Sequence, residues 1–243
     1  MRRTKTHGLT LVEVMITLAI AVVLGGAIMS FYLASLRAGY GTQRQIGLQT
    51  TLRGLSAELI HEASRAHELV LFSSAASADR DAATDRRRIT ADEDGIDLHP
   101  TGDFAVFIFY ETPRPAAQAR YRIARLVGYY AEAIANQPSQ LVRFEIDFRG
   151  SPSTQTVEQA LAAYWNGGTD DIAVTRSILA PSILPLALSD HASLNGGQPQ
   201  LFYLTSVHNV AVCGQLFDSA SGSDTKSALT YTRTFFFTLS VRT

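Results

Sequence analysis

The feature that most constrains the fold is a long apolar stretch near the N-terminus. From Val14 to Leu36 the sequence has no charged side chain. As a helix, these residues would reach about 35 Å, enough to cross the hydrocarbon core of a bilayer. We therefore expect a transmembrane helix at this end of the chain, over Leu9 to Leu36.

Basic residues precede the stretch and set its expected orientation. Arg2, Arg3 and Lys5 all lie before the span. Under the positive-inside rule, residues 1–8 stay in the cytoplasm and everything after Arg37 is carried to the far side. The sequence therefore predicts a single-pass inner-membrane protein with a cytoplasmic N-terminus and a periplasmic head.

Two ordinary kinds of membrane segment explain this end of the chain less well. A secretory signal peptide would have a shorter apolar region, and Ala19-Ile20-Ala21, which could pose as its cleavage site, is followed by further apolar residues. A plain signal anchor explains the span but not Glu13, because a carboxylate inside a bilayer is costly and usually has a partner.

The residues around Glu13 resemble a known processing site. Gly8, Leu9 and Glu13 stand in the order "GLTLVE", which resembles the processing site of type IV prepilins and of type II secretion pseudopilins. The resemblance implies that a prepilin peptidase cuts between Gly8 and Leu9 and methylates the new amine of Leu9. Glu13 would then be the fifth residue of the mature chain and an assembly residue.

Cleavage has a physical consequence for assembly. It removes three basic residues and creates an α-ammonium on Leu9, which the Glu13 carboxylate of a neighbouring subunit can meet. Two unit charges 4 Å apart attract by about 4 kcal/mol at an effective dielectric constant of 20. Leu9 departs from the family, in which phenylalanine is commonest at that position.

The apolar segment also lacks the proline of many major pilins. Gly25-Gly26 is then either a place for local unwinding or a surface for close helix packing, and both interpretations remain open.

Beyond the membrane, the helical pattern continues. Leucines and alanines recur at three- and four-residue spacing up to Leu69-Val70, with charged residues between them. We therefore expect residues 37–72 to form the amphipathic half of the long helix, and Gly39 and Gly41 to kink or interrupt it where it leaves the bilayer.

The remaining sequence, residues 73–243, predicts a globular α+β head. Strands are expected at Asp103–Tyr110, with both faces covered, and at Ile123–Ala133. In Leu141–Arg149, apolar residues alternate with charged ones, which predicts one face on the core and one in water. Leu201–Phe217 and Leu229–Arg242 predict a hairpin. A short helix is expected over Thr154–Trp165.

Other candidate sites are weaker. The acidic cluster Asp92 to Asp97 lacks the ligand spacing of an EF-hand and favours a solvated turn over a calcium site. The three consecutive arginines Arg86–Arg88 indicate an exposed, charged segment rather than a binding site. The six histidines, including His191 and His208, are dispersed, and the sequence contains no metal-ligand helix, nucleophile elbow or P-loop.

Composition argues against two further properties, nucleic-acid binding and an intramolecular disulfide. A formal net charge of −1 provides no basic surface for nucleic acid, and the single cysteine, Cys213, cannot form an intramolecular disulfide. We expect no cofactor, no bound metal and no enzymatic activity.

Together with the expected helix and strands, the resemblance implies a type IV pilin-like α+β fold, in which a long N-terminal helix packs on an antiparallel sheet. The expected function is that of a minor pilin or pseudopilin, with the prepilin peptidase, other pilins and an inner-membrane assembly platform as partners. The strand pattern after the helix is similar to J-type minor pseudopilins and W-type minor pilins, and Glu13 argues against the K-type tip pseudopilin. The alternative is a membrane-anchored binding or adhesion protein that uses the same export route.

Overall fold

The structure is a computed structural model. It describes residues 10–72, 75, 90–91, 97–98, 101–111, 122–134, 137–148, 153, 155–165, 173–186, 199–206, 209–218 and 231–241. The chain divides into two compact units, Met1–Ile46 and Gly47–Thr243.

Helix α1 spans Leu11–Arg65 and so contributes to both units. The helix continues without a break through Gly25, Gly26, Gly39 and Gly41. The interruption expected at Gly39 and Gly41 is therefore absent from α1. A Cβ atom at Gly25 or Gly26 would meet open space, which leaves room for close packing against another helix.

Two hydroxyl groups within the apolar part of α1 form hydrogen bonds inside the helix. Thr17 Oγ1 donates to the carbonyl oxygen of Glu13 at 2.9 Å, and Ser30 Oγ donates to that of Gly26 at 2.9 Å. Polar groups bonded in this way can enter a bilayer without an unpaired donor.

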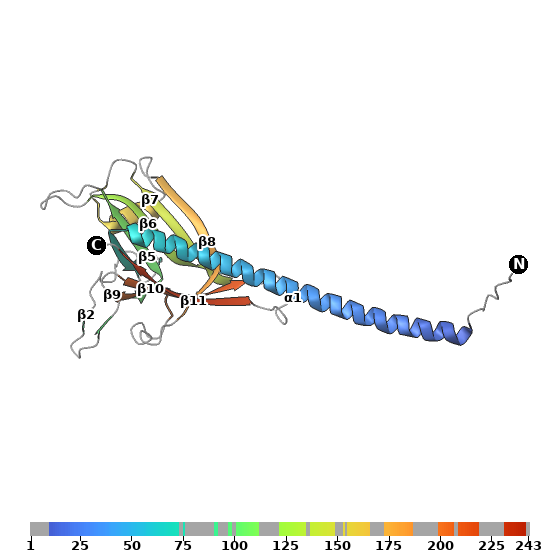
Figure 1. The fold of residues 1–243 in the computed structure, drawn as a ribbon. Coiled ribbons are helices and arrows are strands. Elements are labelled where there is room, and N and C mark those ends of the chain that lie inside the picture. The colour runs from blue at the N-terminus through green and yellow to red at the C-terminus, as the bar shows by residue number, and fades with distance from the viewer. Residues whose placement is uncertain are drawn as a thin grey trace. The chain divides into compact units, whose positions relative to one another are not determined.

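The second unit is built on an antiparallel sheet (Figure 1). The nine described strands of this sheet run in the order β1-β5-β6-β7-β8-β10-β9-β4, with β11 paired to β10. Their bounds are β1 Glu68–Phe72, β4 Thr101–Gly102, β5 Phe104–Tyr110, β6 Ile123–Ile134, β7 Gln137–Asp147, β8 Ala173–Pro185, β9 Phe202–Ser206, β10 Asn209–Asp218 and β11 Tyr231–Ser240. Strands β2 (Thr90–Ala91) and β3 (Asp97–Leu98) form a separate two-stranded sheet, and helix α3 spans Val157–Trp165.

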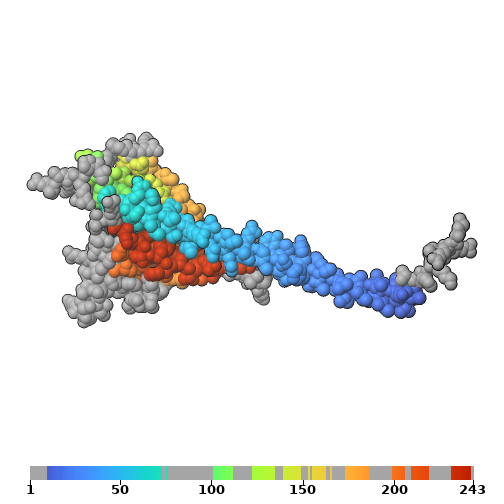
Figure 2. All heavy atoms as spheres, viewed as in Figure 1, coloured from blue at the N-terminus to red at the C-terminus, as the bar shows by residue number. Residues whose placement is uncertain are grey.

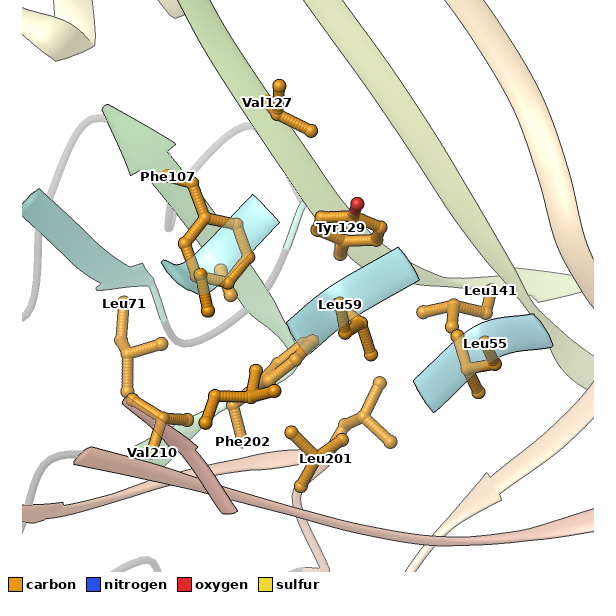
Figure 3. Close-up of a cluster of buried hydrophobic side chains, with 14 of the residues drawn as sticks. Leu55, Leu59, Leu71, Phe107, Val127, Tyr129, Leu141, Leu201, Phe202 and Val210 are labelled. Carbon is orange, nitrogen blue, oxygen red and sulfur yellow. The ribbon is translucent and has the colours of Figure 1, made fainter. Parts of the chain in front are cut away.

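One face of the sheet is covered by the C-terminal part of α1. Figure 1 shows this part of the helix with β6 to β8 on one side of it and β9 to β11 on the other. Figure 3 shows Leu55 and Leu59 of α1 among side chains of several strands, with Tyr129, Leu141 and Phe202 close by. Leucines from one stripe of the helix therefore join distant strands into a single core.

The opposite face is covered by α3. Phe104, Tyr130, Phe144 and Trp165 form an aromatic cluster there, with ring centroids 5.4 to 6.3 Å apart. Gly128 leaves room for it, because a Cβ atom at that position would lie 2.1 Å from the ring of Phe144. The α+β fold expected from the sequence is confirmed.

The amphipathic helix is shorter than predicted. It ends at Arg65, and Leu69-Val70, expected on the helix, lie in β1. The backbone N–H of His67 donates to the carbonyl oxygen of Ile108 at 3.0 Å, and β1 pairs with β5 from there onward. Pairing with a strand more than thirty residues away overrides the local helical spacing.

The strand predictions are confirmed in the centre of the head and incomplete beyond it. β5 and β6 lie where they were expected, β10 and β11 form the expected hairpin, and α3 confirms the short helix. The predicted strand Leu201–Phe217 is in fact two antiparallel strands, β9 and β10.

Strand β8 was missed by the sequence analysis. It pairs with β7 from Ala173 to Ile183. Two prolines, Pro181 and Pro185, lie in its C-terminal half, and proline in a sequence argues against a strand. The β-branched residues Val174, Thr175 and Ile178 favour a strand before them.

Candidate assembly site

The predicted cleavage site, Gly8 and Leu9, lies outside the described residues. Thr10 is the first described residue, and it lies directly before the first turn of α1. Glu13, the predicted assembly residue, lies in that first turn and is exposed.

Thr10 and Glu13 form a reciprocal cap at the start of α1. Glu13 Oε2 accepts hydrogen bonds from the backbone N–H of Thr10 at 3.1 Å and from Thr10 Oγ1 at 3.2 Å. In return, the backbone N–H of Glu13 donates to Thr10 Oγ1 at 3.3 Å. This is a capping box, which satisfies donors that a helix start otherwise leaves unpaired.

The cap gives Glu13 a second role, which the sequence analysis missed. The signal was present in the sequence as Thr10-x-x-Glu13 ahead of an apolar run. Both bonds to the carboxylate go to Oε2, and none joins Oε1 to a described residue. A carboxylate held in this way at the positive end of a helix keeps one oxygen for a cation from outside the chain.

The described residues contain one helix, α1, that is long and apolar enough to cross a membrane. Its most apolar window of 18 residues has a mean hydropathy of 2.4, and none of that window is buried within the chain. A solvent-exposed run of this kind needs a lipid or protein environment to cover it.

A second cluster of charged residues lies inside the head, between α1 and the sheet. Glu62 of α1 is buried, and its carboxylate lies 2.8 Å from Arg125 Nη2 and 3.3 Å from Arg143 Nη2. Glu145 bridges the same two arginines at 3.3 and 2.7 Å, and Glu58 lies 2.9 Å from Arg143 Nε.

This cluster corrects part of the prediction that the charged face of β7 meets water, because Asp147 is exposed as expected but Arg143 and Glu145 are not. Arg143 and Glu145 lie under α1, with side chains 14% and 24% exposed. Burial alone would raise the pKa of Glu145, but the hydrogen bond from Arg143 and the attraction of both arginines hold it below its usual value. Burial raises the pKa of Glu58 above its usual value. The attraction of Arg143 partly opposes this increase, and repulsion from the neighbouring Glu62 adds to it.

The other charged and histidine sites considered from the sequence lie wholly or mostly outside the described residues. Arg86–Arg88, His191 and His208 lie outside the described residues, as does most of the acidic cluster Asp92 to Asp97. Among the residues that are described, no group of three or more His, Cys, Asp or Glu side chains could hold a metal ion. Cys213 is buried and free.

Comparison with known proteins bears on the N-terminal end. Residues 3–29 match the family model of the prokaryotic N-terminal methylation motif, and the match includes Gly8, Leu9 and Glu13. No curated protein and no solved structure matches the chain. The motif supports the type IV pilin and pseudopilin family, whose members are processed by prepilin peptidase, anchored in the membrane and assembled with other pilins, and it implies a structural rather than a catalytic protein.

Proposed function

We propose that the chain is a minor subunit of a type IV pilus or a type II secretion pseudopilus, with a role in starting or tipping the filament. Prepilin peptidase cuts between Gly8 and Leu9 and methylates Leu9. The span Leu9 to Leu36 holds the subunit in the inner membrane with its head in the periplasm, until an assembly platform moves it into the filament. Within this proposal, the order of strands expected from the sequence after the long helix favours a J-type pseudopilin or a W-type pilin.

The observation that carries the proposal is the match of residues 3–29 to the methylation motif. The geometry adds to it, because Glu13 is exposed in the first turn of α1, directly after the predicted new N-terminus. In a stack of such helices, the Glu13 carboxylate of one subunit neutralises the Leu9 ammonium of the next.

The processing step is tested by the intact mass of the protein purified from its host membranes. Prepilin processing leaves a chain that begins at Leu9 with one added methyl group. A chain that retains residues 1–8, or one cut elsewhere without methylation, would contradict the proposal.

The assembly step is tested with Glu13→Gln. Glutamine also completes a capping box, so this change keeps the cap on α1 and removes only the charge. Cleavage and membrane insertion should proceed, and the fraction of subunit recovered in sheared filaments should fall. Glu111→Gln is the matched control, because it removes one exposed carboxylate from the head.

Filament recovery also separates the proposal from its alternative. A membrane-anchored binding or adhesion protein using the same export route would be processed in the same way but would not depend on Glu13 for assembly. Equal recovery of the wild type and Glu13→Gln, with the leader fully removed, would refute the assembly role.

A further inference from the structure

The part of α1 that follows the apolar run carries charge of one sign only. Between Glu13 and Glu58 the only charged side chains are three arginines, Arg37, Arg44 and Arg53. Arg37 comes directly after the apolar run. It is exposed, and it forms no hydrogen bond or ion pair with another described residue. Its charge is therefore available to a partner from outside the chain.

The length of the helix places Arg37 at the level of the lipid phosphates. The uncharged run from Val14 to Leu36 has Gly25 at its middle, and Arg37 lies twelve residues further along, about 18 Å at 1.5 Å per residue. Half of a hydrocarbon core is about 15 Å thick, so in an upright helix the guanidinium group lies in the headgroup layer. Glu13 lies the same twelve residues before Gly25, at the opposite surface.

Two tyrosines flank this level. Tyr32 and Tyr40 of α1 are 56% and 65% exposed. Tyrosine is enriched where a span meets water, because its ring is apolar and its hydroxyl group forms hydrogen bonds. Figure 2 shows the atoms of this part of α1, in blue, at the surface in the view shown. Tyr40 lies three residues after Arg37, so the two side chains are neighbours on the helix and offer a hydroxyl group and a charged donor to the same headgroup layer.

Charge favours a lipid over a second copy of this chain as the partner. Two α1 helices side by side at the same depth in a bilayer would bring Arg37 next to Arg37, and like charges repel. The first acidic residue further along the helix is Glu58, twenty-one residues or about 32 Å away. A lipid phosphate lies at the level of Arg37, and a guanidinium group can bind two phosphate oxygens at once. A phospholipid with a net negative charge is therefore the partner that fits.

We propose that Arg37 binds the phosphate group of an anionic phospholipid in the periplasmic leaflet of the membrane, with Tyr40 as a second donor to the same headgroup layer. The inference rests on the membrane span of the proposed function. The contact holds the waiting subunit at the depth that keeps Glu13 at the cytoplasmic surface. It has to break when the subunit leaves the bilayer for the filament.

The test measures lipid preference by electron paramagnetic resonance. The chain is purified from its host membranes and reconstituted in phosphatidylcholine vesicles with a trace of spin-labelled phosphatidylglycerol or spin-labelled phosphatidylcholine. The immobilised fraction of each label gives the ratio of the two association constants. Arg37→Gln should lower this ratio about fivefold, which corresponds to about 1 kcal/mol for one arginine at an anionic surface. Arg37→Lys keeps the charge and should retain most of the preference.

Arg53→Gln is the matched control. It removes another exposed arginine of α1, sixteen residues or about 24 Å further along the helix than Arg37, and should leave the ratio unchanged. Inorganic phosphate should reduce the preference no more than chloride does at equal ionic strength, because the partner is a lipid and not a free ion. An equal ratio for the wild type and Arg37→Gln, an equal fall for Arg53→Gln, or specific displacement by phosphate would overturn the inference.

The outcome is separable from that of the proposed function. If Arg37→Gln lowers filament recovery but leaves the lipid ratio unchanged, the partner is a carboxylate of a neighbouring subunit, so the lipid inference fails while the proposed function stands. If the intact mass shows that residues 1–8 remain, the proposed function fails. The comparison of the wild type with Arg37→Gln then still decides the lipid contact, because the basic residues of the leader are the same in both chains.

Discussion

Removal of the Glu62 carboxylate should destabilise the head far more than the loss of an exposed carboxylate. In Glu62→Leu, Arg125 and Arg143 lose partners at 2.8 and 3.3 Å in a site where the two guanidinium side chains are only 25% and 14% exposed. Removing one partner of a buried ion pair costs about 3 to 5 kcal/mol. We expect a loss of about 3 kcal/mol, because both arginines keep Glu145 as a partner.

The assay is urea unfolding of the full chain in detergent, followed by tryptophan fluorescence. Trp165 is the single tryptophan of the chain, and it packs on Tyr130 and Phe144 in the core on the α3 side. Its emission therefore reports unfolding of the head. The midpoint should fall with little change in the slope, because the substitution alters stability rather than the surface exposed on unfolding.

Glu132→Leu is the matched control, since it removes a carboxylate from β6 that pairs with Arg176 at the surface, where the side chains are 35% and 47% exposed. Exposed pairs contribute about 0 to 1 kcal/mol, so this change should have a small effect. Combining Glu62→Leu with Arg143→Met should cost less than the sum of the two single changes, because the two residues share one network. Equal effects of Glu62→Leu and Glu132→Leu would refute the reasoning.

Three further predictions follow from the N-terminal motif and the head. Gly8→Val should leave the leader attached, because the peptidase must approach the backbone closely there, and a mature chain of normal mass would contradict this. A truncated chain that starts at Gly41 should be soluble and unfold cooperatively, since the unit from Gly47 onward has its own core; aggregation from several start points would count against it. Burial raises the pKa of Asp103 to about 6, against the hydrogen bond from the backbone of Leu201. The stabilisation from its protonation is therefore full below pH 4 and is lost as the pH rises through 6, so Asp103→Asn should be about 3 kcal/mol more stable than wild type at pH 7 and differ little at pH 4, measured by urea unfolding at both values.

The N-terminal end of the chain is the part best predicted from sequence, because its signals are local. A run without charge from Val14 to Leu36 is sufficient to predict an apolar helix, whatever the rest of the chain does. Even here, one local signal was overlooked. The hydrogen bonds between Thr10 and Glu13 show that the glutamate also caps its own helix.

In the head, the sequence predicted where several strands lie, but it did not predict which side chains surround them. The alternation in β7 correctly marked a strand with two unlike faces. That alternation could not show that Arg143 and Glu145 lie beneath α1, where their partner Glu62 comes from a segment some eighty residues earlier. The spacing that placed Leu69-Val70 on the helix failed for a related reason, because β5 supplies backbone partners that the local pattern does not contain.

By itself, the sequence determined the membrane-length apolar helix, the processing motif at its start and the α+β class of the head. Each of these depends on composition or periodicity within a short segment, which local physical chemistry is enough to interpret. Only the tertiary structure decided where α1 ends, that β8 belongs to the sheet, and that charged residues of α1, β6 and β7 meet in one buried cluster. These features depend on contacts between segments far apart in the chain, and the free energy of burying a charge or pairing a strand is set by the partner that folding brings to it.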